Sequence, residues 1–274
     1  MSLSLITGDS SPAKPGVNVV IAPGELTSPK FARAFAEGCG AGKVSTSHTL
    51  GNAWAGFGSP KTWDSLQQAI RNGDDFYYGD HSYFTDARFH YYRITKNAFQ
   101  HSGETSNPTR GRGFNFFRRG EQFYKEAQPW TNDGRHILVC PQSNDHHSRY
   151  GEADWLERVT RTLQQYSDRP IIVTRKNLGK GKRIVDLRDN LVNAWCIVTH
   201  NSASAIEAIM AGVPAIVTGD SAASPYSLRD PANVEHPMRP DFDRMRWIAT
   251  LAANQWTLAE IKNGTAWEAL KNGR

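Results

Sequence analysis

The stretch WCIVTHNSASAIEAIMAGVPAIVTG, Trp195–Gly219, carries more information about the fold than any other part of this chain. It begins with the apolar run WCIV, which is typical of a buried parallel strand. A turn of small polar residues, THNSAS, comes next, and a short helix then extends from Ala205 to about Met210. Gly212 and Pro214 end that helix, and the apolar run PAIV predicts the next strand. The stretch therefore predicts a βαβ unit with a hydroxyl-rich turn after its first strand.

The position of this turn indicates a ligand site, because ligands of open α/β sheets bind at the carboxyl ends of the strands. The free N–H groups and partial positive charge at the start of the helix suit a phosphate. A purely structural interpretation is also available. Ser204 and Glu207 have the spacing of a capping box, and Asn201 or Ser202 could cap the helix equally well. His200 could simply bond to the backbone at the strand end.

The segment HNSASAIEAIMAGVPAIV, residues 200–217, resembles the donor-binding motif of GT-B-fold glycosyltransferases. The closest similarity is to capsule-polysaccharide transferases and related phage-encoded transferases. In such enzymes a small-residue turn surrounds the phosphates of a nucleotide sugar, and a glutamate early in the helix binds the ribose hydroxyls. The resemblance implies that Glu207 binds the ribose. It implies phosphate contacts for His200, Asn201, Ser202 and Ser204.

Strands and helices alternate along the second half of the chain. Strands are expected at Ile137–Cys140 and Pro170–Val173, and helical segments at Asp154–Tyr166, 184–193, Asp243–Leu251 and Thr257–Leu270. This alternation predicts a parallel sheet with helices on both faces. The resemblance to GT-B proteins implies that the last helices cross back to the first domain.

The first half opens with a strand over Val17–Ala22, a turn, and a helix over Pro29–Glu37 that Ser28 is placed to cap. Later elements are less regular: a helix over 59–72, a short strand over Phe76–Tyr78, irregular strand and loop over Tyr83–Thr95, and a loop-rich stretch over 101–135. A first unit of strand, turn and helix is typical of a Rossmann-like domain, although the GxGxxG fingerprint of dinucleotide-binding proteins is missing.

These patterns predict an α/β fold with two Rossmann-like domains facing a cleft, as in GT-B proteins. We expect a flexible leader over 1–16, an acceptor-side domain over 17–130, a nucleotide-sugar-binding domain over 131–250, and a C-terminal helix over 251–274 returning to the first domain.

Composition limits the compartment and the partners that we expect for the protein. None of the apolar runs among the 274 residues approaches the roughly 18 residues of a membrane helix, and the first residues do not form a secretory signal. Cys39, Cys140 and Cys196 are too widely spaced to indicate a disulfide framework or a zinc site. We therefore expect a cytoplasmic protein without a membrane span. The net charge of +5 is compatible with an anionic donor, an anionic polymer acceptor or nucleic acid.

Two further loops contribute candidates for donor binding. Gln142 and Ser143 follow the first strand of the second domain and could contact phosphate or base. Arg175 and Lys176 follow the next strand, where a basic residue pairs with a phosphate in the resembling enzymes. The alternatives are a solvated basic loop for 175–183 and a polar surface loop, rather than a metal site, around Asp145-His146-His147.

A transferase that activates a hydroxyl acceptor needs a general base. Asp80 and His81, in the aromatic segment YGDHSYF, are the first candidates, and Glu25 in the turn after the first strand is the competitor. In the structural alternative, Asp80 is a turn residue after Gly79 and His81 packs on aromatic rings.

Cations and aromatics are interleaved in RGRGFNFFRR, residues 110–119, a composition that can follow a phosphate backbone and stack bases. Arg112, Arg118 and Arg119 are therefore candidates for acceptor binding, and Trp54 is a candidate for stacking on sugar rings. The alternative is an ordinary strand with solvated arginines. Asp241 and Asp243 match a metal-binding DxD pattern, but their place before a helix predicts capping instead.

The sequence thus predicts a glycosyltransferase that moves a sugar from a nucleotide sugar to a hydroxyl acceptor, such as a glycan. We expect no metal and no cofactor besides the donor as co-substrate. Three alternatives stay open: a phage-type DNA glycosyltransferase acting on hydroxymethylated pyrimidines, a nucleotide-sugar epimerase or hydrolase, and a non-catalytic binding module.

Overall fold

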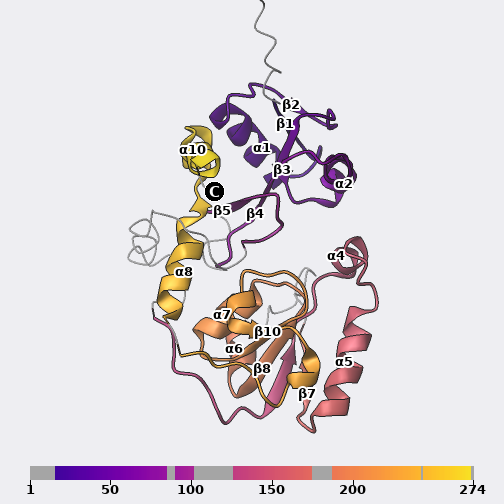
Figure 1. Cartoon of the computed structure of the whole chain (residues 1–274), viewed down its shortest axis with the longest axis vertical. Coiled ribbons are helices and arrows are strands. Elements are labelled where there is room, and N and C mark those ends of the chain that lie inside the picture. Colours follow the sequence, from indigo (N-terminus) through magenta and orange to yellow (C-terminus); the bar gives the residue numbers. More distant parts are fainter. Residues whose placement is uncertain (1–15, 85–89, 102–125, 175–186, 242, 273–274) are drawn as a thin grey trace, which may run out of the picture.

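Two β-sheets, each with helices on both faces, form the framework of the protein (Figure 1). The computed structural model describes residues 16–84, 90–101, 126–174, 187–241 and 243–272. The Arg112, Arg118, Arg119, Arg175 and Lys176 candidates lie outside these ranges, as does most of the expected leader. The predicted α/β class with parallel sheets is confirmed.

The first sheet has the strand order β11-β5-β4-β3-β1-β2. Its strands are β1 (Val17–Val20), β2 (Val44–Ser45), β3 (Ala53–Phe57), β4 (Phe76–His81), β5 (Tyr92–Lys96) and β11 (Gln255–Trp256). The first four are parallel, whereas β5 runs antiparallel to β4 and β11 antiparallel to β5. Sequence patterns predicted only irregular structure around β5 and helix near β11, so the antiparallel extension is a correction.

Helices cover the two faces of the first sheet. Helix α1 (Thr27–Gly38) packs Phe31 and Phe35 on the face that carries Ala53 and Ala55. Helix α2 (Trp63–Asn72) follows a short 3-10 turn (Pro60–Thr62) and packs on the opposite face, where Trp54 lies. The alternation of successive side chains along β3 separates the two cores.

The second sheet is entirely parallel, with the order β10-β9-β8-β6-β7. Its strands are β6 (His136–Val139), β7 (Ile171–Val173), β8 (Ala194–Thr199), β9 (Ala215–Val217) and β10 (Ser227–Leu228). The short helices around it are α4 (Asn144–Arg149), α6 (Leu187–Leu191), α7 (Ser204–Met210) and the 3-10 turns Ser224–Tyr226 and Pro231–Asn233. Helix α5 (Trp155–Tyr166) packs on one face, and α7 on the other.

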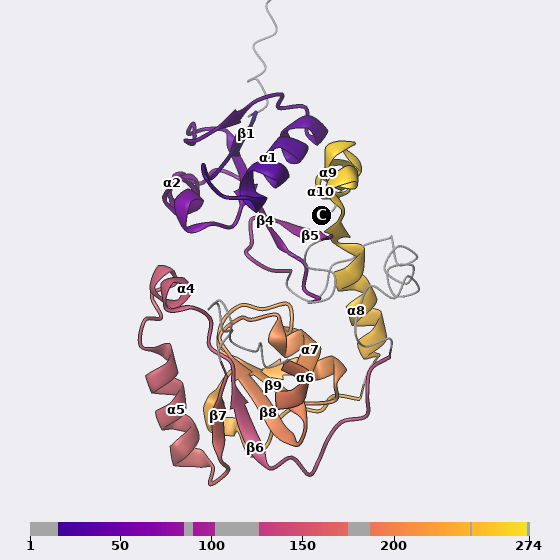
Figure 2. The ribbon, with the colours of Figure 1, turned by 180° about the vertical axis from the view of Figure 1, so that it is seen from behind.

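The C-terminal segment passes from the second sheet back to the first (Figure 2). Helix α8 (Arg244–Ala253) packs on the second sheet, where Trp247 Nε1 donates a hydrogen bond to Ala222 O. Asp243 caps this helix through Arg246 N, as predicted. The chain then forms β11 in the first sheet, followed by α9 (Leu258–Lys262) and α10 (Thr265–Asn272). The sequence predicted one helix here, but Gly264, with φ +84°, separates two.

The start of α1 also differs from the prediction. The helix begins before Ser28, so this residue is not its N-cap. Its buried hydroxyl instead accepts a hydrogen bond from Ala22 N at 3.0 Å, just after β1. Ser28 therefore fixes the turn that carries Glu25. No described helix is both long and apolar enough to cross a membrane.

The end of α1 lies directly against α9. A Cβ atom on Gly38 would come within 1.9 Å of Ile261 O, so no other residue fits without separating the two helices. We expect Gly38→Ala to destabilise the fold by at least about 2 kcal/mol, since overpacking against fixed backbone is costly. Urea unfolding measures this effect, with Lys30→Ala at an exposed position of α1 as the matched control. Equal stability of the two variants would contradict the close packing.

His101 is buried beside Tyr83, with its Nδ1 2.9 Å from the Tyr83 hydroxyl. Burial, assisted by the charge of Arg93, lowers the pKa of His101 to about 3. Below pH 6.5 the unfolded chain therefore binds a proton that the folded chain does not, and the stability falls as the pH falls. At pH 5 the His101 contribution amounts to about 2 kcal/mol.

This contribution is measurable with His101→Asn, because the asparagine side chain retains an acceptor for the Tyr83 hydroxyl but does not titrate. The free energy of unfolding between pH 7 and pH 5 should decrease about 2 kcal/mol less in the variant than in the wild type. The same decrease in both proteins would show that His101 does not carry this pH dependence.

Candidate functional site

Both sheets contain a topological switch point, where the chain leaves two neighbouring parallel strands in opposite directions. In the first sheet, β1 and β3 lead to helices on opposite faces, and in the second sheet β6 and β8 do the same. The loops after these strands are the places where ligands of open α/β sheets bind.

The switch point of the second sheet brings Gln142 and Asn201 together. Their side-chain carboxamides are in contact, although 59 positions separate them in the sequence. The carboxamide orientation that satisfies its neighbours places Gln142 Oε1 3.0 Å from Asn201 N and 2.9 Å from Ser202 N. Two successive N–H groups thus converge on one oxygen, which is the way backbone turns bind anions.

His146 completes this group of polar side chains. Its Nε2 lies 3.2 Å from Asn201 Oδ1. Burial lowers the pKa of His146 to about 4, so the ring is neutral at pH 7, and its Nε2 can share a hydrogen bond with the Asn201 carboxamide. The sequence predicted a polar surface loop here. Instead, α4 turns His146 inward and stacks the buried His147 on Trp155, with 5.0 Å between ring centroids.

Ser143 has a local role. Its exposed hydroxyl accepts a hydrogen bond from His146 N at 3.1 Å and thereby caps α4. The predicted phosphate or base contact of Ser143 stays a prediction, whereas its capping role follows from the geometry.

His200 is only 7% exposed and supports the turn from beneath. Its Nδ1 lies 3.1 Å from Thr218 Oγ1, and a Cβ on Gly219 would come within 2.5 Å of its ring. Burial lowers the pKa of His200. Such a packed ring holds two loops together through the Thr218 side chain, whereas the structural alternative from the sequence had His200 bonded to the backbone.

The start of α7 lacks the capping box that the sequence allowed. Ala203 is the N-cap residue, and its own side chain makes no capping hydrogen bond. The Ser202 hydroxyl accepts a hydrogen bond from Ser204 N at 3.2 Å, while the Ser204 hydroxyl is buried beside the Cys140 thiol. Glu207 is half-buried in the first helical turn. The first N–H group of the helix is thus bonded by Ser202, one of the capping alternatives that the sequence allowed, and not by Ser204.

The switch point of the first sheet holds Glu25. Its Oε1 accepts a hydrogen bond of 2.5 Å from the hydroxyl of Ser59, which follows β3 and is 3% exposed. Glu25 forms no ion pair with any residue that the structure describes. The sequence placed Glu25 correctly after the first strand, but it indicated Ser59 only as the start of a helix.

Asp80 and His81, the other two candidates, are already engaged in the fold. Asp80 on β4 lies opposite Arg93 on β5 and forms an ion pair with its buried guanidinium. Burial opposes the charge of Arg93, but Asp80 together with Tyr83 and Tyr78 outweighs this effect, and the pKa of Arg93 is raised. The ring of His81 packs edge-on against Phe57 at 5.1 Å. Asp80 thus neutralises a buried cation, and His81 adopts the predicted structural alternative.

Trp54 does not match its predicted role. It is fully buried among Val20, Leu66, Ala69 and Phe76, and its Nε1 donates to Ser65 Oγ at 3.1 Å. A ring in this position cannot stack on a sugar, so the sequence-based prediction is corrected. The alternation along β3 turns Trp54 toward α2 rather than toward solvent.

The carboxyl edges of the two sheets face each other (Figures 1 and 2). Helix α4 lies between α5 and the first sheet in both views, and aromatic contacts join the halves. Tyr150 follows α4, and its ring centroid lies 5.2 Å from that of Trp63 and 5.5 Å from that of Phe99. Both switch points therefore lie on the sides of the sheets that are turned toward each other.

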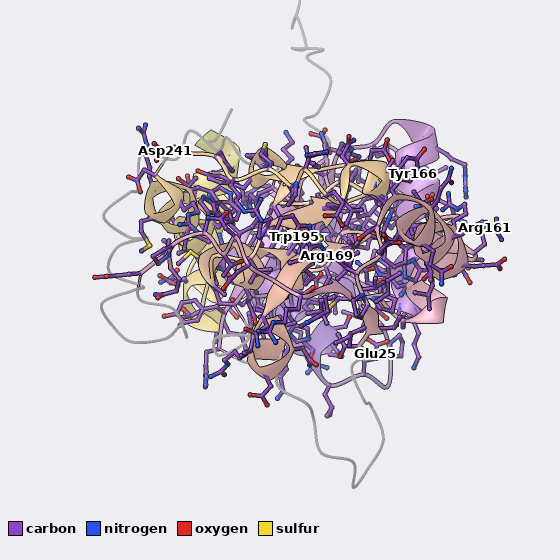
Figure 3. The ribbon with its side chains drawn as sticks, turned by 90° about the horizontal axis from the view of Figure 1, so that it is seen from below. Glu25, Arg161, Tyr166, Arg169, Trp195 and Asp241 are labelled. Carbon is purple, nitrogen blue, oxygen red and sulfur yellow. The ribbon has the colours of Figure 1, made fainter. Side chains whose placement is uncertain are left out.

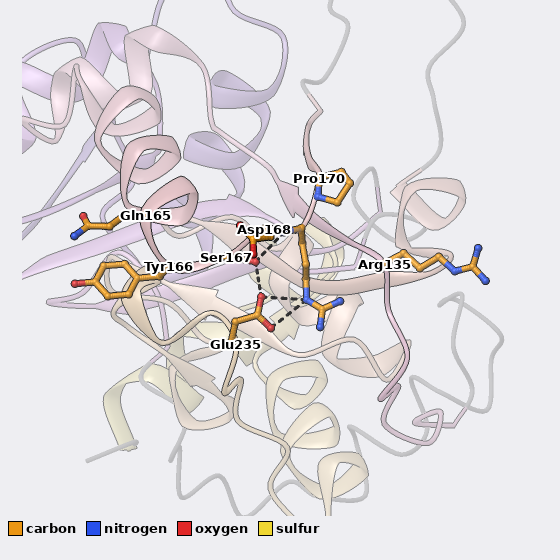
Figure 4. A pocket seen from close by; sticks show the side chains of 8 residues that line it. Arg135, Gln165, Tyr166, Ser167, Asp168, Pro170 and Glu235 are labelled. Atoms are coloured by element: carbon orange, nitrogen blue, oxygen red, sulfur yellow. Dashed lines mark hydrogen bonds and ion pairs between the residues drawn. The ribbon is translucent and has the colours of Figure 1, made fainter.

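A surface pocket of about 590 Å³ lies elsewhere, at the amino end of β7 (Figure 4). Ser167 and Arg169 both bond to Glu235 there, and the Arg169 guanidinium lies 3.9 Å from the Trp195 ring centroid (Figure 3). Ser167, Arg169 and Glu235 are thus engaged with one another, and the pocket lies at the opposite end of the strands from the switch point. The switch points are therefore the stronger site candidates. No three His, Cys, Asp or Glu side chains in the described ranges are grouped to hold a metal ion.

Comparison with known proteins finds a similar fold among solved structures. No family model and no curated protein matches the chain. Thermosulfurimonas dismutans KpsC, beta Kdo 2,4 transferase, is similar in structure, with a TM-score of 0.50 and 16% identity over 89% of this chain and 92% of that one. The beta Kdo 2,7 transferase of the same protein matches with a TM-score of 0.45 and 12% identity, over 80% and 85%. The predicted resemblance to capsule-polysaccharide transferases is thus confirmed at the level of fold.

Proposed function

We propose that the protein is a GT-B-type glycosyltransferase that transfers a sugar from a nucleotide sugar to a hydroxyl acceptor. The observation that carries the proposal is the pair of switch points on facing sheets, each lined by polar side chains. In this arrangement the second sheet binds the donor and the first sheet binds the acceptor. The fold shared with a protein named as a beta Kdo 2,4 transferase supports the same reaction type.

The donor phosphate binds at the turn after β8. A phosphate oxygen takes the place of Gln142 Oε1, and the N–H groups of Asn201 and Ser202 donate to it. Glu207 binds the ribose hydroxyls, and Arg175 and Lys176, outside the described residues, add positive charge. These groups stabilise the nucleotide as it leaves from the anomeric carbon.

Glu25 acts as the general base for the acceptor hydroxyl. Among the three predicted candidates, it is the one at a switch point and without an ion pair to a described residue. Asp80 instead neutralises Arg93, and His81 packs on Phe57. The reaction as proposed needs no metal ion. A DNA acceptor depends on Arg112, Arg118 and Arg119, which lie outside the described residues, so the proposal does not include it.

Nucleotide binding at this turn is testable without knowledge of the acceptor. We expect one of CMP, UDP, GDP, ADP or TDP to raise the melting temperature, because a ligand of the folded state stabilises by about 2.7 kcal/mol at one hundred times its Kd. Gln142→Glu should weaken that binding at least tenfold, since a carboxylate at the turn repels the phosphate. The absence of binding by all five nucleotides, in melting and in calorimetry, would reject the donor site.

Gln165→Glu is the matched control for this experiment. Gln165 lies on α5 at the surface pocket, so the substitution makes the same change of charge far from the turn. Unchanged affinity in this variant assigns the effect to the switch point. A loss in Gln165→Glu with normal binding by Gln142→Glu would place the nucleotide in the surface pocket instead.

Glu25→Gln should lower the rate of sugar transfer by about 100-fold or more, the usual contribution of a general base, without a change in nucleotide affinity. Glu37→Gln, at an exposed glutamate near the end of α1, is the control with the same chemical change. The transfer rate is measured with the donor that the nucleotide screen identifies. Full activity of Glu25→Gln would exclude it as the base.

Asp80→Asn tests whether Asp80, rather than Glu25, is the general base. This change leaves the buried Arg93 charge without its partner, so a loss of stability of about 3 kcal/mol is expected. A stable Asp80→Asn protein that binds nucleotide but transfers no sugar would assign the base to Asp80. Turnover of the donor at the same rate with no acceptor present would indicate a hydrolase or an epimerase.

A further inference from the structure

Gln100 is a residue of the first half whose side chain reaches the predicted donor turn. It lies after β5, and its Nε2 donates a hydrogen bond of 2.7 Å to Asn201 O. Its Oε1 accepts from Ala222 N at 3.3 Å. One carboxamide therefore connects the loops that follow β8 and β9 in the second sheet.

The segment that presents Gln100 is itself firmly held. The neighbouring residue, His101, is buried, and its backbone N–H donates to the Tyr83 hydroxyl at 2.9 Å. Tyr83 N in turn donates to Gln255 Oε1 at 2.9 Å, at the point where the C-terminal segment enters the first sheet. Buried hydrogen bonds therefore fix the distance between Gln100 and the first sheet.

The carbonyl that Gln100 binds belongs to the residue at the centre of the switch point. Asn201 offers its N–H to the oxygen of Gln142, and its side chain contacts both Gln142 and His146. The hydrogen bond to Asn201 O limits rotation of the peptide group that follows, which carries the Ser202 N–H. The two N–H groups thus keep a common direction while Gln100 is in place.

We propose that Gln100 is a positioning residue that holds the phosphate-binding turn in its binding conformation, so that nucleotide affinity depends on contact between the two halves. The inference rests on the proposed function, because it takes the turn at Asn201 as the nucleotide site. Gln100 itself does not contact the reacting atoms. Its effect on the nucleotide passes through the main chain of Asn201.

Gln100→Glu tests the role with almost no change of shape. A glutamate keeps an acceptor for Ala222 N, but when ionised it cannot donate to Asn201 O and instead places a negative charge beside it. A protonated glutamate donates again. We therefore expect CMP or UDP, whichever the wild type binds, to bind about tenfold more weakly at pH 8. At pH 5 about one sixth of a glutamate with the ordinary pKa of about 4.3 is protonated, so part of this affinity should return.

Three of the groups near Gln100 do not titrate between pH 5 and pH 8, and burial lowers the pKa of a fourth, His200. Burial lowers the pKa of His101 to about 3 and that of His146 to about 4, and the pKa of Arg93 is raised, with Asp80 as its ionic partner. The nucleotide phosphate does titrate near pH 6, so each affinity is divided by that of the wild type at the same pH. Gln165→Glu, with an equal change of charge on α5, should follow the wild type at both pH values.

Gln100→Ala provides the second variant, and its affinity should be reduced equally at pH 8 and pH 5 because alanine cannot regain the donor. Recovery in Gln100→Glu alone supports the positioning role. Wild-type affinity in Gln100→Glu at pH 8, or an equal loss at both pH values, overturns it. Failure of the wild type itself to bind CMP, UDP or any other nucleotide rejects the proposed function instead.

Discussion

The order of parallel strands is the constraint on which the rest of the structure depends. In each sheet the first strand in the chain pairs with the second strand on one side and with the third strand on the other. This gives the orders β2-β1-β3-β4 and β7-β6-β8-β9. The helices after the two central strands must then pack on opposite faces. Because these helices diverge, the loops that follow the two central strands lie side by side, and neither helix covers the space between them. Glu25 and Ser59 occupy this place in the first sheet, and Gln142 and Asn201 occupy it in the second.

The polar groups at the second switch point are paired with one another rather than left open. Asn201 is 6% exposed, and a buried amide without a partner costs roughly 1–3 kcal/mol, so Gln142 and Gln100 stabilise the turn when no ligand is present. In the proposed donor site, an anion that enters must replace the Gln142 oxygen. Binding as proposed exchanges one hydrogen-bond acceptor for another, and the favourable difference comes from the negative charge of the incoming group.

Local patterns in the sequence predicted the second sheet well and the first sheet less well. The residues of β8 and β9 form apolar runs, and those of α7 between them have helical spacing. Each pattern can therefore be recognised within one short segment. By contrast, β5 and β11 become strands only because partners distant in sequence pair with them, as Gln255 does with Arg93. The burial of Trp54 and the inward direction of His146 depend on helices packed from elsewhere, which no local pattern contains.

The contacts between the halves show why the candidate residues of one half cannot be judged alone. Arg93 is buried because the antiparallel β5 covers the edge of the parallel strands, and its charge then requires Asp80. The same strand β5 leads to Gln100, and so to the turn of the second sheet. A carboxylate that looked catalytic in the sequence therefore supports the fold. Glu25 lies at the other switch point, where its carboxylate accepts a hydrogen bond from the Ser59 hydroxyl and forms no ion pair with a described residue, so it is the carboxylate that suits the proposed role of base.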